Sequence, residues 1–176
     1  FPLRWDPGSG EDPYAGFREF GFLPEAMINF LAFLGWNPGG EKEMYSLDEL
    51  IDQFQLDDIG KSGSRFDFDK ALWYNQQYIL QKDSSFLIPR LEKELKQRDL
   101  SVSKPIEQKV CSLFQERIQT LNDLWPSCYY CFEEVSEYDR KPLKKKWKGA
   151  MVEHYGDFLS ALKTVSEWSA SEIEGE

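Results

Sequence analysis

The sequence predicts a mainly α-helical protein, and three observations support this fold class. Apolar residues recur at helical spacing over several segments of ten residues or more. Prolines stand at the start of such segments, where a missing N–H costs no hydrogen bond. Polar capping residues precede others, as in the Ser46–Glu49 pattern of a capping box. The expected exception is a short extended arm at residues 1–5, followed by a loop rich in Gly, Pro and Asp that reaches residue 20.

Two helices are expected in the first part of the chain. The first begins at Pro24 and ends at Gly35, and because it is apolar nearly all round it should be a central, buried helix. A turn follows at Asn37–Gly40. The capping box at Ser46 then opens a short helix that reaches about Gln55.

The next two helices follow a loop over residues 60–67. One should run from about Asp69 to Leu80. A polar stretch at Asp83–Ser85 caps the other, which reaches about Gln97 and has Pro89 near its start. The buried face of the first should carry Leu72, Trp73, Gln76 and Ile79.

The rest of the chain also has helical patterns. Ser103 opens a long amphipathic helix that is expected to continue to about Asn122. Pro126 interrupts the pattern before an aromatic helical stretch over residues 129–132, Pro142 restarts a basic helix, and residues 158–165 continue an amphipathic one. A boundary near residues 81–83 divides an N-terminal unit, residues 1–81, from a helical unit, residues 82–176.

Length and composition exclude several classes of protein. The 176 residues can bury a core, and 41% of them are apolar, which excludes a disordered acidic tail. No run of 18 apolar residues is present, so no membrane span is expected. Three cysteines are too few for a disulfide scaffold and indicate a reducing, cytosolic setting. The net charge of −10 argues against a protein that coats nucleic acid or binds DNA generally.

The charge is nevertheless distributed unevenly. Residues 1–60 hold 3 basic and 12 acidic residues, whereas residues 61–110 hold 10 basic and 7 acidic ones. Residues 141–150 hold 5 basic residues and no acidic one. Because electrostatic attraction is screened over about 8–10 Å, two such basic islands can bind phosphate in an acidic chain.

No motif indicates catalysis or metal binding. Ile59–Ser62 resembles the end of a P-loop, but Gln55 stands where the motif needs its first glycine. The Cys128–Cys131 pair has the spacing of a metal knuckle, yet only Cys111 and His154 remain as further ligands, so small buried side chains in a helix are the simpler interpretation. We therefore predict no catalytic residue and no metal site in this chain.

Two basic segments are candidates for contact with RNA. The loop from Lys61 to Asp67 carries two cations and two hydroxyls before a helix, a composition that suits phosphate and ribose contacts and equally suits a plain surface loop. The run Lys141–Lys148 could contact RNA or a membrane, or could be only a solvated helix face.

Two long segments closely resemble one enzyme family. "GFLPEAMINFLAFLGWNPGG" at Gly21–Gly40 and "YSLDELIDQFQLDDIGKSGSRFDFDKALWYNQQYI" at Tyr45–Ile79 resemble bacterial-type glutamyl-tRNA synthetase, a class I glutamate–tRNA ligase. The resemblance is dense over Gly21–Ile79. It is looser afterwards, although "LFQERIQTLNDL" at Leu113–Leu124 resembles a helix of the family's anticodon domain.

The resemblance implies an internal piece of such a ligase. The family's His-x-Gly-His and Lys-x-Ser-Lys-Arg sequences, which bind ATP, do not occur here, and the chain is expected to begin just after the second of them. It would also stop before the family's final helical segment. By resemblance, residues 1–81 are then a helical stem-contact region and residues 82–176 the first part of an α-helical cage of the anticodon-binding type.

The resemblance also implies roles for particular residues. Lys61, Ser62, Ser64 and Arg65 would contact phosphate and ribose at the inner corner of the tRNA. Asn75 is included in this tRNA-binding set, with a role in bracing the loop. Arg117 would present its planar guanidinium to an anticodon base, and its alternative role is an exposed charge paired with an acidic residue.

The expected partners are tRNA(Glu) and the catalytic domain of the same parent chain, with no DNA and no membrane. A cytoplasmic monomer is expected. ATP and Mg would serve the parent enzyme, and no cofactor is expected in this piece. The alternative hypothesis is an acidic α-helical protein-interaction module without RNA binding.

Overall fold

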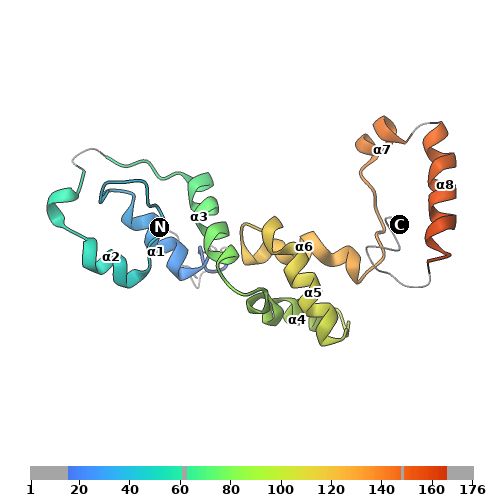
Figure 1. Ribbon diagram of the computed structural model, residues 1–176, viewed down its shortest axis with the longest axis horizontal. Helices are drawn as coiled ribbons and strands as arrows, with labels where there is room; N and C mark the ends of the chain where they lie inside the picture. Colours follow the sequence, from blue (N-terminus) through green and yellow to red (C-terminus); the bar gives the residue numbers. More distant parts are fainter. Residues whose placement is uncertain (1–15, 61–62, 148, 166–176) are drawn as a thin grey trace, which may run out of the picture. The chain divides into compact units, whose positions relative to one another are not determined.

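The structure is a computed structural model that describes residues 16–60, 63–147 and 149–165. The chain divides into two compact units, one that ends at Glu133 and one that begins at Glu134. Helices α1 to α6 belong to the first unit, and α7 and α8 to the second (Figure 1). The described residues form no sheet, and a single isolated bridge joins Trp36 and Ile59. The predicted fold class, mainly α, is confirmed. The extended arm predicted at residues 1–5 lies outside the described residues.

Helix α1 (Pro24–Ala32) is shorter and more exposed than the sequence predicts. Pro24 stands at its first turn, and the helix ends three residues before Gly35. Ala26, Asn29 and Phe30 are buried, but Ile28 and Leu31 are 40% and 38% exposed. The prediction of a helix buried all round is therefore wrong. Helix α1 packs against α3 (Phe68–Leu80) and also contacts the next helix, and Ile28 and Leu31 lie on its exposed side.

Helix α2 (Leu47–Gln53) begins at the predicted capping box. The Glu49 N–H donates to the Ser46 hydroxyl, and the Glu49 carboxylate accepts from the Ser46 N–H at 2.8 Å. The short helix η1 (Leu56–Asp58) follows α2 and leads to Ile59. Trp36, Tyr45 and Leu50 form a small apolar cluster beneath this region.

Helix α3 buries a different face from the predicted one. Trp73 is 37% exposed, and of the predicted set only Ile79 is buried. The buried residues are Ala71, Tyr74, Asn75, Tyr78 and Ile79. The prediction is wrong because two of these side chains are polar and find hydrogen-bond partners inside the fold, which the apolar spacing alone does not reveal.

The second half of this unit consists of η2 (Ser84–Leu87), α4 (Ile88–Gln97), α5 (Lys104–Phe114), η3 (Gln115–Arg117), η4 (Leu121–Asp123), α6 (Leu124–Cys128) and η5 (Tyr129–Cys131). The helix predicted from Ser103 to Asn122 is wrong beyond Phe114. The chain turns into η3, and Ile118 is extended and fully buried. The Gln115 amide donates at 2.8 Å to the carbonyls of Ile79 and Lys82, so long-range bonds replace continued helix.

One apolar core joins the helices of the first unit. It contains side chains from α1, α3, α4, α5 and α6, including Phe30, Ile79, Leu91, Phe114 and Leu124. The core thus includes residues from both sides of the boundary predicted near residue 81. The division into residues 1–81 and 82–176 stays a prediction.

The second unit contains α7 (Arg140–Lys146) and α8 (Ala150–Leu162). Asp139 caps α7 by accepting from the Lys141 N–H at 2.9 Å, and Pro142 lies within the first turn. None of the side chains described in this unit is buried. The basic helix predicted at Pro142 is confirmed, and the amphipathic pattern predicted over residues 158–165 continues α8 only to Leu162.

Candidate nucleic-acid interface

The predicted basic loop leads directly into α3. Asp67 caps this helix, because its carboxylate accepts from the Lys70 N–H at 3.1 Å. The cap fixes the direction in which residues 63–66 approach the helix. Ser64 and Arg65 are exposed just before the cap. Lys61 and Ser62, the two other predicted loop contacts, lie outside the described residues.

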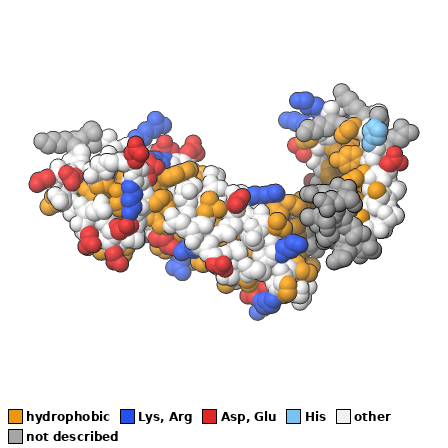
Figure 2. All heavy atoms as spheres, viewed as in Figure 1, with side chains coloured by type: hydrophobic (Ala, Val, Ile, Leu, Met, Phe, Trp, Pro, Cys, Tyr) orange, Lys and Arg blue, Asp and Glu red, His pale blue; other side chains and the backbone are white. Residues whose placement is uncertain are grey.

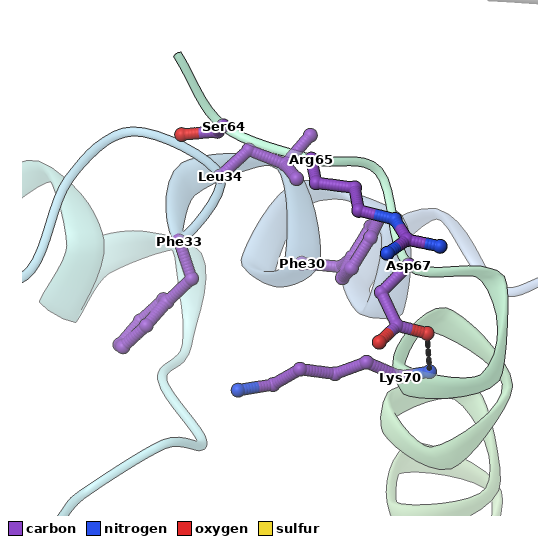
Figure 3. A pocket seen from close by; sticks show the side chains of 7 residues that line it. All are labelled: Phe30, Phe33, Leu34, Ser64, Arg65, Asp67 and Lys70. Atoms are coloured by element: carbon purple, nitrogen blue, oxygen red, sulfur yellow. Dashed lines mark hydrogen bonds between the residues drawn. The ribbon is translucent and has the colours of Figure 1, made fainter. Parts of the chain in front are cut away.

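Ser64 and Arg65 line a surface hollow of about 260 Å³. Its floor is apolar and comes from α1 and the residues after it, and its rim carries the polar side chains of the loop and of α3 (Figure 3). The lining residues are Phe30, Phe33, Leu34, Ser64, Arg65, Asp67 and Lys70. The Arg65 guanidinium and the Ser64 hydroxyl at this rim can contact a phosphate and the sugar beside it, while the Asp67 carboxylate on the same rim is engaged as the helix cap.

The two cations of the hollow differ in their partners. The Lys70 ammonium lies 3.1 Å from the Glu43 carboxylate, which neutralises it. Arg65 forms no ion pair within the described part of the chain. Figure 3 shows the Arg65 guanidinium and the Lys70 ammonium pointing in different directions. Arg65 is therefore the cation of this hollow that is available to an anionic ligand.

Asn75, the predicted brace of the loop, lies away from the surface. Its side chain is fully buried. Its amide oxygen accepts from the Leu23 N–H at 2.7 Å, and its amide nitrogen donates to the Gln119 carbonyl at 2.6 Å. Asn75 thus ties the start of α1 to the segment after η3. Its side chain thus has no exposed surface, and the role in tRNA binding predicted for it stays a prediction.

Further contacts connect the same two segments, the residues before α1 and the residues after η3. The Leu121 N–H donates to the Gly21 carbonyl at 3.0 Å, and the Asn122 amide donates to the Glu19 carbonyl at 2.7 Å. Gly21 has a φ of +86°, and a Cβ there would lie 2.8 Å from the Asn122 nitrogen and 2.9 Å from that of Leu121. Only glycine fits this conformation and this close approach without strain.

Arg117 is exposed on η3 rather than on the predicted long helix. Its Cζ atom lies 5.4 Å from the centroid of the Phe114 ring. The described residues offer it no carboxylate partner, contrary to the alternative of a paired surface charge. The Gln76 amide donates to the Glu116 carbonyl at 3.1 Å, and this bond holds η3 against α3. The guanidinium is thus displayed from an anchored turn.

The cysteines are the candidates for a metal site. The described residues contain no group of three or more His, Cys, Asp or Glu side chains that could hold a metal ion. Cys111 and Cys128 are buried, whereas Cys131 is exposed, so the predicted burial holds for only one member of the Cys128–Cys131 pair. Burial raises the pKa of Cys111 to about 11 and that of Cys128 to about 12.

Two features of the site are not evident in the sequence. Lys70 joins the hollow because it lies three residues after the capping Asp67, a spacing that places it on the first turn beside the loop. Asn29 is fully buried and holds the chain after α1. It donates to the Glu43 carbonyl, and it accepts from the Tyr45 N–H and the Tyr78 hydroxyl, both at 2.7 Å. No local sequence signal indicates these long-range bonds.

The chain is similar to known proteins over nearly its whole length. The anticodon binding domain family matches residues 79–176. Glutamate–tRNA ligases from Amoebophilus asiaticus and Bacteroides fragilis are 39% and 40% identical to it, and they cover 99% and 100% of this chain. The crystal structure of a glutamate tRNA ligase from Elizabethkingia meningosepticum, in complex with its amino acid, matches 99% of the chain with a TM-score of 0.84 and 34% identity.

The match covers only part of each relative. The chain spans 34% of the length of both ligases and of the crystallised protein. No helix in the described part of the chain has the length and apolar character needed to cross a membrane. Since the family match includes more than half of the residues, the chain belongs to the anticodon binding domain family, in the form that occurs in glutamate–tRNA ligases.

Proposed function

We propose that this chain is the tRNA-binding portion of a glutamate–tRNA ligase. In this role it positions tRNA(Glu), while a catalytic domain of the same parent protein attaches glutamate with ATP and Mg. The observation that carries the proposal is Arg65 at the rim of the hollow beside α3, which has no ion-pair partner in the part of the chain that the structure describes, together with the match of residues 79–176 to an anticodon binding domain.

Two surfaces would divide the contact with tRNA. Residues 1–81 would meet the inner corner of the tRNA through Lys61, Ser62, Ser64 and Arg65, where phosphate and ribose contacts position the RNA without reading its sequence. Residues 82–176 would reach the anticodon, where the Arg117 guanidinium can form two hydrogen bonds to a base edge or stack on a base. Asn75 supports both surfaces indirectly, because it ties the start of α1 to Gln119.

Binding of a glutamate tRNA transcript by the full chain tests the proposal. Fluorescence anisotropy at several salt concentrations gives the slope of the logarithm of affinity against the logarithm of salt. Arg65→Ala should weaken binding and reduce this slope by about 0.9, the value for one lost phosphate contact. Arg117→Ala should weaken binding and also reduce discrimination between tRNAs with different anticodons.

Lys42→Ala is the matched control. It removes the same charge from the same unit, but Lys42 is already paired with Glu49 at 2.6 Å. Its slope should equal that of the parent chain. Absence of tRNA binding at low salt by a folded chain would refute the proposal and favour the alternative, an acidic α-helical interaction module.

A further inference from the structure

We propose that α7, together with the aromatic side chains of Trp147 and of Tyr155 on α8, forms a second RNA contact that binds an unpaired nucleotide and its flanking phosphates. This inference rests on the proposed function, and it adds RNA-binding residues other than Arg65 and Arg117. It gives a role to the described cations of the predicted basic run, for which the family resemblance implies none.

The cations of α7 have no acidic partners among the described residues. Four of them are described, namely Arg140, Lys141, Lys144 and Lys145, and none lies within ion-pair distance of a carboxylate. The nearest acidic residue in sequence, Asp139, is used as the helix cap. The first unit holds both kinds of cation. Arg65 and Arg117 have no carboxylate partner among the described residues, whereas six others do, namely Lys42, Lys70, Lys82, Arg90, Arg98 and Lys104. The charge of α7 is therefore available for phosphate.

Aromatic side chains lie next to these cations. Arg140, Lys144 and Trp147 follow one another at spacings of four and three residues, which place them on one side of the helix. Trp147 is the C-cap of α7, and its N–H donates to the Leu143 carbonyl at 2.8 Å, which ties it to the last turn of the helix. The Trp147 ring centroid lies 4.7 Å from that of Tyr155 on α8. This contact brings the aromatic side chains beside the basic helix.

The aromatic surface remains open in this unit. Trp147 and Tyr155 are 44% and 42% exposed. A hollow of about 260 Å³ adjoins Tyr155 and is lined by Met151, His154, Tyr155 and Phe158. In Figure 2 the Lys and Arg side chains of this unit lie at its edge, near acidic as well as hydrophobic side chains.

These features favour RNA as the occupant. Exposed aromatic rings next to unpaired cations are the combination that binds single-stranded nucleic acid, because bases stack on the rings while phosphates meet the cations. A protein partner of the same surface would have to be acidic to match the charge of α7. The established family match extends over this whole unit, which places the surface within an anticodon binding domain.

The test uses the full chain and two labelled probes. One is a single-stranded RNA with the anticodon-loop sequence of a glutamate tRNA, and the other is the same sequence in a duplex. Trp147→Ala should weaken binding of the single strand by about five- to 150-fold, which corresponds to the 1–3 kcal/mol of one stacked base. Trp147→Phe should retain most of the affinity, and the duplex should respond less because its bases are already stacked.

Lys144→Ala should reduce the salt slope for the single strand by about 0.7. The matched control is Lys163→Ala, which removes an exposed cation from the end of α8, away from α7 in sequence. It should bind as the parent chain does. Far-ultraviolet circular dichroism of each variant confirms that helix content is unchanged.

The possible failures are distinguishable. A chain that binds glutamate tRNA in an Arg65-dependent manner, but loses nothing on Lys144→Ala and Trp147→Ala, contradicts this inference alone. A chain that binds neither tRNA nor the single strand contradicts both proposals. Self-association that Trp147→Ala abolishes, without binding of the single strand, would assign the surface to a protein interface and overturn the inference.

Discussion

Replacing Asn75 with alanine is expected to destabilise the first unit severely. The substitution leaves the Leu23 N–H and the Gln119 carbonyl without their partner. The bond to Leu23 is buried, so its loss costs the full desolvation of a backbone donor, about 1–3 kcal/mol. The bond to Gln119 is only partly buried, so water can replace part of it, and its loss costs about 0.5–1.5 kcal/mol.

The sum is about 1.5–4.5 kcal/mol, a large fraction of the 5–15 kcal/mol by which a typical domain is stable. Urea unfolding, followed by far-ultraviolet circular dichroism, measures this change as a lower midpoint with an unchanged slope. Binding of tRNA should weaken as well, even though the Asn75 side chain is buried. The reason is that the bonds of Asn75 hold together the two regions that carry Arg65 and Arg117.

Gln76→Ala is the control for Asn75→Ala. Gln76 is the next residue of α3 and also donates one bond to a backbone carbonyl, that of Glu116, but this bond is exposed. Its loss should cost about 0.5 kcal/mol. If Asn75→Ala lowers the free energy of unfolding no more than Gln76→Ala does, the buried Asn75 amide does not hold the start of α1 to Gln119, and the reasoning is refuted.

Three further predictions concern stability and thiol reactivity. Gly21→Ala should lower the free energy of unfolding by more than about 2 kcal/mol, because the added Cβ would overlap Leu121 and Asn122. Gly39 has a similar φ of +81° but lies in open space, so Gly39→Ala should cost only about 1 kcal/mol. Urea unfolding midpoints compare the two variants, and equal losses would contradict the overlap at Gly21. Burial raises the pKa of Tyr78, so the stability that its protonated hydroxyl contributes is present below about pH 10 and is lost as the pH rises further. In the Tyr78→Phe variant the urea midpoint should therefore fall less steeply as the pH rises above about 10. A midpoint that falls with pH as steeply as in the parent chain would contradict this assignment. Cys131 should react with maleimide in the native chain before the two buried cysteines do, as mass spectrometry would show; simultaneous labelling of all three would contradict their burial.

Local patterns predict several elements correctly. The capping box at Ser46 and Glu49 is such a case, because each of its bonds joins residues three apart in sequence. The proline at the start of α1 is another, since its effect depends only on the first turn. The predicted loop that carries Arg65 also lies where expected, directly before α3, because Asp67 caps that helix from its own N-terminus.

The errors arise where distant residues decide the structure. The spacing of apolar residues after Ser103 fits a helix through residue 122, but the bonds from Gln115 to Ile79 and Lys82 and the burial of Ile118 end it at Phe114. The buried face of α3 is mispredicted for the same reason, because Asn75 meets partners more than 40 residues away. Arg117 is a candidate by family resemblance, but its position on an anchored turn depends on long-range contacts such as the bond from Gln76 to Glu116.

The hydrogen bonds between the segment at Glu19–Gly21 and the segment at Leu121–Asn122 also have a consequence for synthesis of the chain. The Glu19 carbonyl accepts its bond from a side chain 103 residues later. At about 5–20 residues per second, the ribosome needs roughly 5–20 s to make that distance. Throughout this interval the segment before α1 has emerged without its partner, and its backbone must be satisfied by water. Final folding of this unit is thus timed by the arrival of residues 119–122 and not by the completion of α1 to α3.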